Sequence, residues 1–289
     1  MSVHAGGRLI MPADTSDSIS SDTDQTSATK KDGASPKMRI TIQENGPYMV
    51  EGSVPLSQDA IELGKDGKHY EYAHVRDYDV DETYLLCRCG MSENKPFCDY
   101  SHLKGGFDGH ETADKTPYEK RATRYKGPDL TLYDDDRCAY ARLCHRKDGD
   151  VWKLTALSTT EPYEKEAVEA SWHCPTGRLT HVDNNSEEVY EQDFEPSIVA
   201  LEDVELKVSG PLFVRGGVPL IGADGTEYET RNRYALCRCG KSQNKPFCDA
   251  MHCNTGFSDG SQAFSKPEDD IDNTFAQIAG AADAAEQGL

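Results

Sequence analysis

The sequence predicts an α+β protein built from two small β-rich modules with a different α+β segment inserted between them. The first observation is a cysteine-rich string at residues 87–102 that occurs again at 237–252. The second is a run of strand and turn signals that precedes both strings in the same order. The third is a middle segment with cysteines of its own. Duplication of a whole module predicts two copies that pack against each other as an intrachain pseudo-dimer.

The modules set the expected domain boundaries. We expect an irregular tail at 1–37, because this Ser/Thr/Asp-rich stretch buries too little apolar surface to order itself. The first module then covers 38–118, the insert 119–199 and the second module 200–264, and an acidic tail with a short helix occupies 265–289. Asp-Gly pairs at 66–67 and 224–225 predict a hairpin in each module.

Each cysteine-rich string offers three thiols and one imidazole, a ligand set for a soft metal ion or an iron–sulfur cluster. The eight candidates are Cys87, Cys89, Cys98 and His102 in the first copy, and Cys237, Cys239, Cys248 and His252 in the second.

The spacing predicts the local geometry of each string. Cys87 and Cys89 are expected at a strand end or in a loop. Cys98 and His102 are four residues apart and are expected on one face of a helix that begins after Pro96. Asp99 then falls in the first turn, where the helix dipole favours a carboxylate.

Other interpretations of the strings are weaker. A disulfide framework uses paired cysteines, whereas each copy has three and a histidine. A structural zinc site is the better rival, but zinc sites usually separate paired ligands by two to four residues rather than one. A metal-free string is disfavoured because the whole pattern recurs.

The pattern C-x-C-x2-S-x3-P-x-C-D-x2-H resembles the CDGSH iron–sulfur domain family, the mitoNEET-like group. The resemblance implies a [2Fe–2S] cluster in each copy, held by three Cys and one His. It also implies polar positions that tune each cluster: Ser92, Lys95 and Asp99, then Ser242, Lys245 and Asp249. The glycine that follows the aspartate in the family is Tyr100 in one copy and Ala250 in the other. This change does not threaten ligation but alters the surroundings of each histidine.

The insert contains C-x5-C, followed about thirty residues later by Cys-Pro, and is similar to divergent mono-cluster ferredoxins. Cys138, Cys144 and Cys174 match ligand positions, while Ala141 occupies the central one. Three thiolates suit a [3Fe–4S] cluster.

A [4Fe–4S] cluster in the insert would need an outside ligand, and the candidates are His145, His173, Asp136 or water. The alternative is that the three cysteines are ordinary buried thiols. The tenth cysteine, Cys253, is interpreted as a spare thiol.

Composition limits the partners. A formal net charge of −20 argues against nucleic acid and anionic membranes. The charge is explained by solubility, by a salt-tolerant source or by a field complementary to a basic redox partner. No apolar run reaches the length of a membrane span, and the N-terminus lacks the apolar core of a signal peptide. Ten cysteines in metal-type spacings suit a reducing compartment, so we expect a cytoplasmic protein.

No nucleophile–base pair or phosphate cradle is evident, so we expect an electron-transfer protein rather than an enzyme. It would act on a redox partner protein, as a monomer with internal pseudo-twofold symmetry or as a homodimer. Two alternatives remain open. With the same sites, the protein could be a donor of clusters to apo-acceptor proteins or a redox or iron sensor. It could also be an electron-wiring subunit of a larger complex.

Overall fold

The computed structural model describes residues 37–64 and 69–261. Three expected features lie outside the described residues. They are the tail at 1–37 except for its last residue, the Asp66-Gly67 turn and the helix in 265–289. The described chain is a mixture of short helices and several small sheets, compatible with the α+β prediction.

The first copy contributes strands from two sheets and one short helix. Its elements are β1 (Arg39–Ile42), β2 (Tyr48–Glu51), β3 (Leu56–Leu63), β4 (His69–Tyr78), β5 (Thr83–Leu86) and α1 (His102–Gly105). The second copy has β12 (Ser197–Asp203), β13 (Val208–Arg215), β14 (Leu220–Ile221), β15 (Arg233–Leu236) and α5 (Met251–Thr255). The strand β12 begins at Ser197, so the boundary expected at 199/200 falls inside a strand.

The two copies exchange strands. One sheet has the order β14-β1-β2-β5, and another has the order β15-β13-β12-β3-β4. In the four-stranded sheet, β14 of the second copy pairs in parallel with β1 of the first copy. In the five-stranded sheet, β3 of the first copy pairs in parallel with β12 of the second copy. The exchange begins with equivalent hydrogen bonds, from Ile40 N to Pro219 O at 2.9 Å and from Ile198 N to Pro55 O at 2.8 Å.

One hydrophobic core serves both copies. Alternate residues of the strands point inward, as the period of a half-buried strand requires, and the inward residues of both copies form a single cluster. From the first copy it includes Ile40, Ile42, Val50 and Leu86, and from the second Ile198, Ala200, Val214 and Leu236. Neither copy encloses this core by itself.

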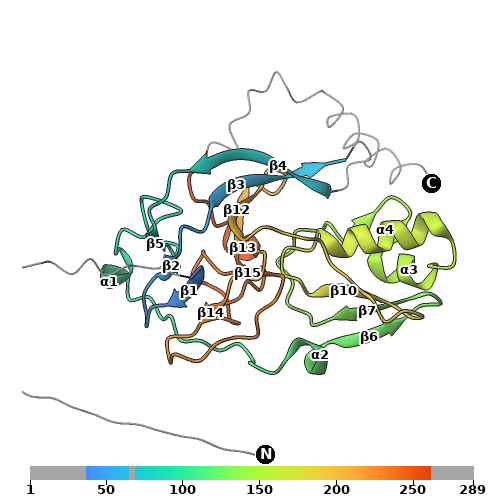
Figure 1. The fold of residues 1–289 in the computed structure, drawn as a ribbon. Helices are drawn as coiled ribbons and strands as arrows, with labels where there is room; N and C mark the ends of the chain where they lie inside the picture. The colour runs from blue at the N-terminus through green and yellow to red at the C-terminus, as the bar shows by residue number, and fades with distance from the viewer. Residues whose placement is uncertain (1–36, 65–68, 262–289) are drawn as a thin grey trace, which may run out of the picture. The chain divides into compact units, whose positions relative to one another are not determined.

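The insert has a separate sheet with helices on one side. The sheet order is β11-β10-β7-β6, with β6 (Thr123–Lys126), β7 (Leu130–Asp134), β10 (Leu179–Asp183) and β11 (Val189–Tyr190). The helices α3 (Val151–Ala156) and α4 (Glu161–Trp172) pack on it (Figure 1). A hairpin of β8 (His145–Arg146) and β9 (Gly149–Asp150) precedes them, and α2 (Tyr118–Arg121) leads into β6. Asp150 caps α3 by accepting a hydrogen bond from Lys153 N at 2.9 Å.

Candidate metal centres

The same loop construction presents the candidate ligands in each copy. The strand β5 ends at Leu86, so Cys87 follows directly, as predicted for a ligand at a strand end. Cys87 N donates to Pro96 O at 2.8 Å, and Leu86 forms a bridge with Phe97. The second copy repeats both contacts, with Cys237 N donating to Pro246 O at 2.8 Å. A closed loop therefore holds the first two cysteines close to the third.

The four donors of each copy form two pairs. In the first copy, Cys87 Sγ lies 3.8 Å from Cys89 Sγ, and Cys98 Sγ lies 3.7 Å from His102 Nδ1. The matching distances in the second copy are 3.6 Å and 3.4 Å. Two ligands of one tetrahedral ion, with bonds of about 2.3 Å to sulfur and about 2.1 Å to nitrogen, lie about 3.6–3.8 Å apart.

These pairs favour a binuclear centre over a single ion. Among the residues that the structure describes, no group of three or more His, Cys, Asp or Glu side chains converges on one ion position. A mononuclear zinc site would bring all four donors around one point, whereas a two-iron centre needs one pair at each iron. The donor arrangement fits the second requirement.

The thiols of the first pair in each copy already share a proton. The hydrogen bond between Cys87 and Cys89 lowers the pKa of Cys87 to about 6 and raises that of Cys89. The matching bond to Cys239 lowers the pKa of Cys237 to about 7. Metal ligation requires thiolates, and one is therefore accessible near neutral pH in each copy.

The helix expected to carry both Cys98 and His102 does not form. The helix α1 begins only at His102, and Tyr100 adopts a left-handed backbone with φ of 65°. Ala250 does the same before α5, with φ of 68°. These positions are those where the family pattern has glycine, the residue that adopts this conformation without steric cost. Periodicity alone could not reveal that turn.

Asp99 braces the loop rather than a helix. Its carboxylate accepts from Glu93 N at 2.8 Å and Ser101 N at 3.0 Å, and these backbone donors hold the pKa of Asp99 below its usual range. Asp249 accepts equivalent bonds from Gln243 N at 2.7 Å and Met251 N at 3.2 Å. The two aspartates fix the path between the second and third cysteines.

The other polar positions also act on the loop backbone. Ser92 and Ser242 each donate to a phenylalanine carbonyl inside their own loop at 2.7 Å. Lys95 donates to Ser92 O. Lys245 contributes its carbonyl, which accepts from Thr112 N at 2.9 Å. The last contact joins the second loop to the first copy.

Sequence analysis did not identify the buried arginines between the first two cysteines. Arg88 Nε donates to Gly46 O at 2.8 Å, and Arg238 Nε donates to Gly210 O at 2.7 Å. Arg238 also pairs with Glu202 at 2.6 Å and with Asp259 at 2.5 Å. The recurrence of C-R-C in both strings was the available signal, because an arginine between two ligands is not needed for ligation.

The two loops touch each other through their glycines. A Cβ atom at Gly90 would lie 2.5 Å from Cys239 O, and one at Gly240 would overlap Cys89 O. Both glycines also have positive φ, at 78° and 75°. The candidate sites of the two copies are therefore neighbours, in contact through backbone next to a ligand.

The surroundings of the two sites differ. Cys98 is partly exposed, whereas its counterpart Cys248 is only 3% exposed. Ala139 of the insert packs against Cys248, and the guanidinium of Arg137 lies 4.3 Å from the centroid of the Phe247 ring. Burial also lowers the pKa of His252 to about 4. The insert therefore packs against the second site, and the third cysteine of the first site is more exposed than its counterpart.

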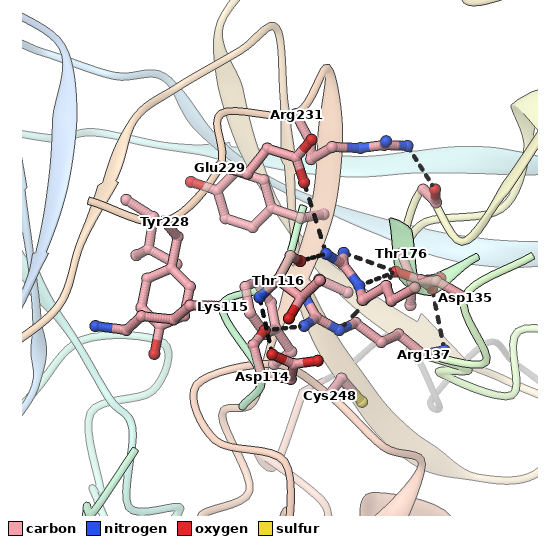
Figure 2. Close-up of a pocket in the computed structure, with 16 residues that line it drawn as sticks. Asp114, Lys115, Thr116, Asp135, Arg137, Thr176, Tyr228, Glu229, Arg231 and Cys248 are labelled. Atoms are coloured by element: carbon pink, nitrogen blue, oxygen red, sulfur yellow. Dashed lines mark hydrogen bonds and ion pairs between the residues drawn. The ribbon is translucent and has the colours of Figure 1, made fainter. Parts of the chain in front are cut away.

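A tightly packed polar interface lies between the insert and the second site. Figure 2 shows Asp135 and Arg137 of the insert close to Cys248. Arg121 of the insert lies 3.6 Å from Glu229 of the second copy, and Arg231 donates to Gly177 O at 3.0 Å. The cavity they enclose measures about 20 Å³, room for about one water molecule, and is too small for an organic substrate.

The three cysteines of the insert line one cavity of about 160 Å³. Tyr140 N donates to Cys138 Sγ at 3.3 Å, as Tyr100 N does to Cys98 Sγ at the same distance. Burial raises the pKa of Cys144 to about 12, with a further contribution from the neighbouring Cys174. Cys138, Cys144 and Cys174 thus border the same cavity, although no three of the described His, Cys, Asp or Glu side chains converge on one ion position there.

The candidates for a fourth ligand in the insert are placed differently. His145 lines the cavity of the three cysteines. His173 has its Nδ1 within 2.8 Å of Arg146 and 2.7 Å of Glu169 O. Asp136 is exposed and lies 3.4 Å from Arg178. Of these side chains, His145 is the one that borders the cavity.

The shared core and the paired donors define a metal-binding protein with two equivalent sites. Residues 45–103 and 209–253 match the family model of the iron-binding zinc finger of CDGSH type. These two segments are therefore tandem CDGSH-type domains, and the match does not extend to the insert. No curated protein and no solved structure matched the chain. Among the described residues, no helix is long and apolar enough to cross a membrane.

Proposed function

We propose that this protein is an electron carrier with two [2Fe–2S] clusters and a third cluster in the insert, of the [3Fe–4S] or [4Fe–4S] type. The observation that carries the proposal is the division of each 3Cys–1His set into two pairs with tetrahedral spacing. When bound, such clusters would take up and release single electrons. We further propose that the insert is a ferredoxin-like domain and that the molecule is not an enzyme.

Within this proposal each residue has a defined task. Cys87, Cys89, Cys98 and His102 hold one cluster, and their counterparts Cys237, Cys239, Cys248 and His252 hold the other. A neutral histidine in place of a thiolate raises the reduction potential. Asp99 and Asp249 orient the loops through backbone hydrogen bonds, a supporting role common around metal ligands.

The arrangement of the three sites supports passage of electrons through the chain. The first and second sites meet at Gly90 and Cys239, and the second meets the insert at Cys248 and Ala139. The pairing of strands between the copies supports our proposal that they form an intrachain pseudo-dimer. The second site thus has contacts with both the first site and the insert, and these contacts support a carrier with three linked centres.

Metal analysis of anaerobically purified protein tests the proposal. Iron, zinc and acid-labile sulfide are measured per chain, with EPR spectra before and after reduction by dithionite. We expect about seven or eight iron atoms, from two binuclear clusters and one of three or four irons. About four iron atoms would leave two clusters around a metal-free insert. Zinc in place of iron would refute the proposed function.

Cluster donation is a second candidate, because Cys98 is partly exposed and could release its cluster to an acceptor. Holo protein is mixed with an apo-ferredoxin, and the two proteins are separated by gel filtration. Movement of visible absorption to the ferredoxin would favour donation over electron transfer. Purification together with a fixed partner would instead favour a subunit of a larger complex.

A further inference from the structure

Three apolar side chains lie on the surface of the first copy beside its candidate metal site. Met91, Tyr100 and Leu103 have exposed fractions of 38%, 54% and 76%. The centroid of the Tyr100 ring lies 6.0 Å from that of His102, and the Met91 side chain lies across Gly105 of α1. We call these three side chains the first-copy patch. Grouped exposed apolar side chains mark interaction sites.

The second copy differs at the same face. The positions equivalent to the first-copy patch carry Lys241, Ala250 and Cys253. Its metal site is covered instead by residues 137–142 of the insert, where Ala139 packs on Cys248 and Arg142 pairs with Asp203 at 2.8 Å. The duplicated loops therefore have different surroundings: the insert packs against the second, whereas exposed apolar side chains border the first.

Acidic groups adjoin the first-copy patch. Glu93 and Asp99 are exposed on the same loop. A depression of about 530 Å³ begins near the first copy's metal site at Asn45. Its carboxylates are Glu44, Asp108, Glu111 and Asp224. Lys104 and Lys115 offset only part of this charge, and the whole chain carries −20.

We propose that the first-copy patch is the docking surface for an electron-exchange protein with an apolar centre and a rim of lysine and arginine. This inference rests on the proposed electron-transfer function. An apolar contact area with a charged rim matches the usual anatomy of a protein interface, and opposite charges accelerate encounter. A second copy of this chain fits less well, because its like charge opposes association. Electrons enter or leave at the first site, and the covered second site exchanges them within the chain.

The test measures electron transfer to a basic protein and to a small oxidant. Holo protein reduced with dithionite, and freed of excess reductant, is mixed by stopped flow with cytochrome c or with ferricyanide. In the triple variant Met91→Gln/Tyr100→Ser/Leu103→Gln we expect the rate constant with cytochrome c to fall about tenfold. The rate with ferricyanide should stay the same, because the small ion needs no docking surface.

A matched control and a second measurement keep the test independent of folding defects. The variant Tyr125→Ser/Val189→Gln removes two apolar side chains that are 43% and 54% exposed on the insert, and both rates should equal those of the wild type. In the wild-type complex, carbodiimide should link lysines of cytochrome c to Glu93 and Asp99. Iron content confirms that each variant is loaded.

Four results would overturn the inference. The triple variant could react with cytochrome c as fast as the wild type, or the cross-links could lie on carboxylates far from the patch, such as Glu164 of α4. A wild type that is dimeric in gel filtration, with a monomeric triple variant, would assign the patch to self-association. Wild-type protein that reduces neither oxidant would overturn the proposed function as well, which separates that failure from the other three.

Discussion

Replacement of Gly90 by alanine should separate the two metal-binding loops. The added Cβ would lie 2.5 Å from Cys239 O, and the neighbouring atoms are backbone atoms that cannot rotate away. Gly106 is a matched control, because its φ of 63° is similarly left-handed while a Cβ there meets nothing within 4 Å. The pair of variants therefore separates the cost of the backbone conformation from the cost of contact between the copies.

The expected magnitudes follow from these two terms. An alanine in the left-handed region costs about 1–2 kcal/mol, partly offset because alanine restricts the unfolded chain. Gly106→Ala should therefore lower the free energy of unfolding by about 1 kcal/mol. Gly90→Ala has the same cost and adds overpacking against a rigid backbone, which contributes about 1–3 kcal/mol more.

Urea unfolding of anaerobic holo protein, followed by far-ultraviolet circular dichroism, measures the difference. With an m value of about 3 kcal/mol/M, the midpoint of Gly90→Ala should lie about 0.3–1 M below that of Gly106→Ala. Visible absorption recorded in parallel shows whether clusters leave before the chain unfolds. Equal midpoints for the two variants would refute the close approach of the loops, and with it the proposed contact between the first and second sites.

Three further predictions concern single residues. Ala250→Gly should raise the urea midpoint, because glycine adopts the left-handed φ of 68° at this position without steric cost. The control Ala122→Gly should lower the midpoint, because the φ of −72° there suits alanine. Each change in the free energy of unfolding is about 0.5–1 kcal/mol. Burial lowers the pKa of His181 to about 3, whereas in the unfolded chain it is about 6.5. The free energy of unfolding therefore falls as the pH drops below about 6.5, because the unfolded state takes up a proton that the folded state does not. Between pH 7 and 5, the wild type should lose about 2 kcal/mol more than His181→Gln. His102→Cys should lower the reduction potential of the first cluster in a redox titration.

Each of these predictions has a result that contradicts it. A lower midpoint for Ala250→Gly would mean that its left-handed backbone stores no strain. Parallel pH profiles for the wild type and His181→Gln would show that the imidazole is not held neutral between Thr155 and Ser171, its partners at 2.8 Å and 3.1 Å. An unchanged potential for His102→Cys would place His102 outside the cluster.

Sequence patterns predicted the parts of the site that depend on local order. Cys87 was expected at a strand end or in a loop, and it directly follows β5, which ends at Leu86. The paired copies were expected because the whole module recurs. The exchange of β3 and β14 was not predictable, because β14 covers only Leu220–Ile221, and so short a strand carries no information about its partner. Parallel pairing with β1 is decided by the core that both copies fill.

The surroundings of the ligands were beyond sequence reasoning for a different reason. Both strings contain the same donors and the same C-R-C arginine, so the ligand pattern itself does not show which site is buried. The difference arises from residues far along the chain: Ala139 covers Cys248, and Glu202 and Asp259 pair with Arg238. Burial of this kind depends on tertiary packing, which periodicity does not encode.

Fusion of the two copies into one chain explains how this difference can exist. In a symmetric homodimer every contact occurs twice, so any segment that covers one site also covers the other. A single chain removes that constraint, and the insert can pack against Phe247 and Cys248 while Phe97 and Cys98 remain partly exposed. Two sites with identical donors then differ in dielectric and access, which are properties that set potential and exchange at iron–sulfur centres. Under the proposed electron-transfer function, duplication within one chain would give the two sites different potentials and different access, which a symmetric pair does not have.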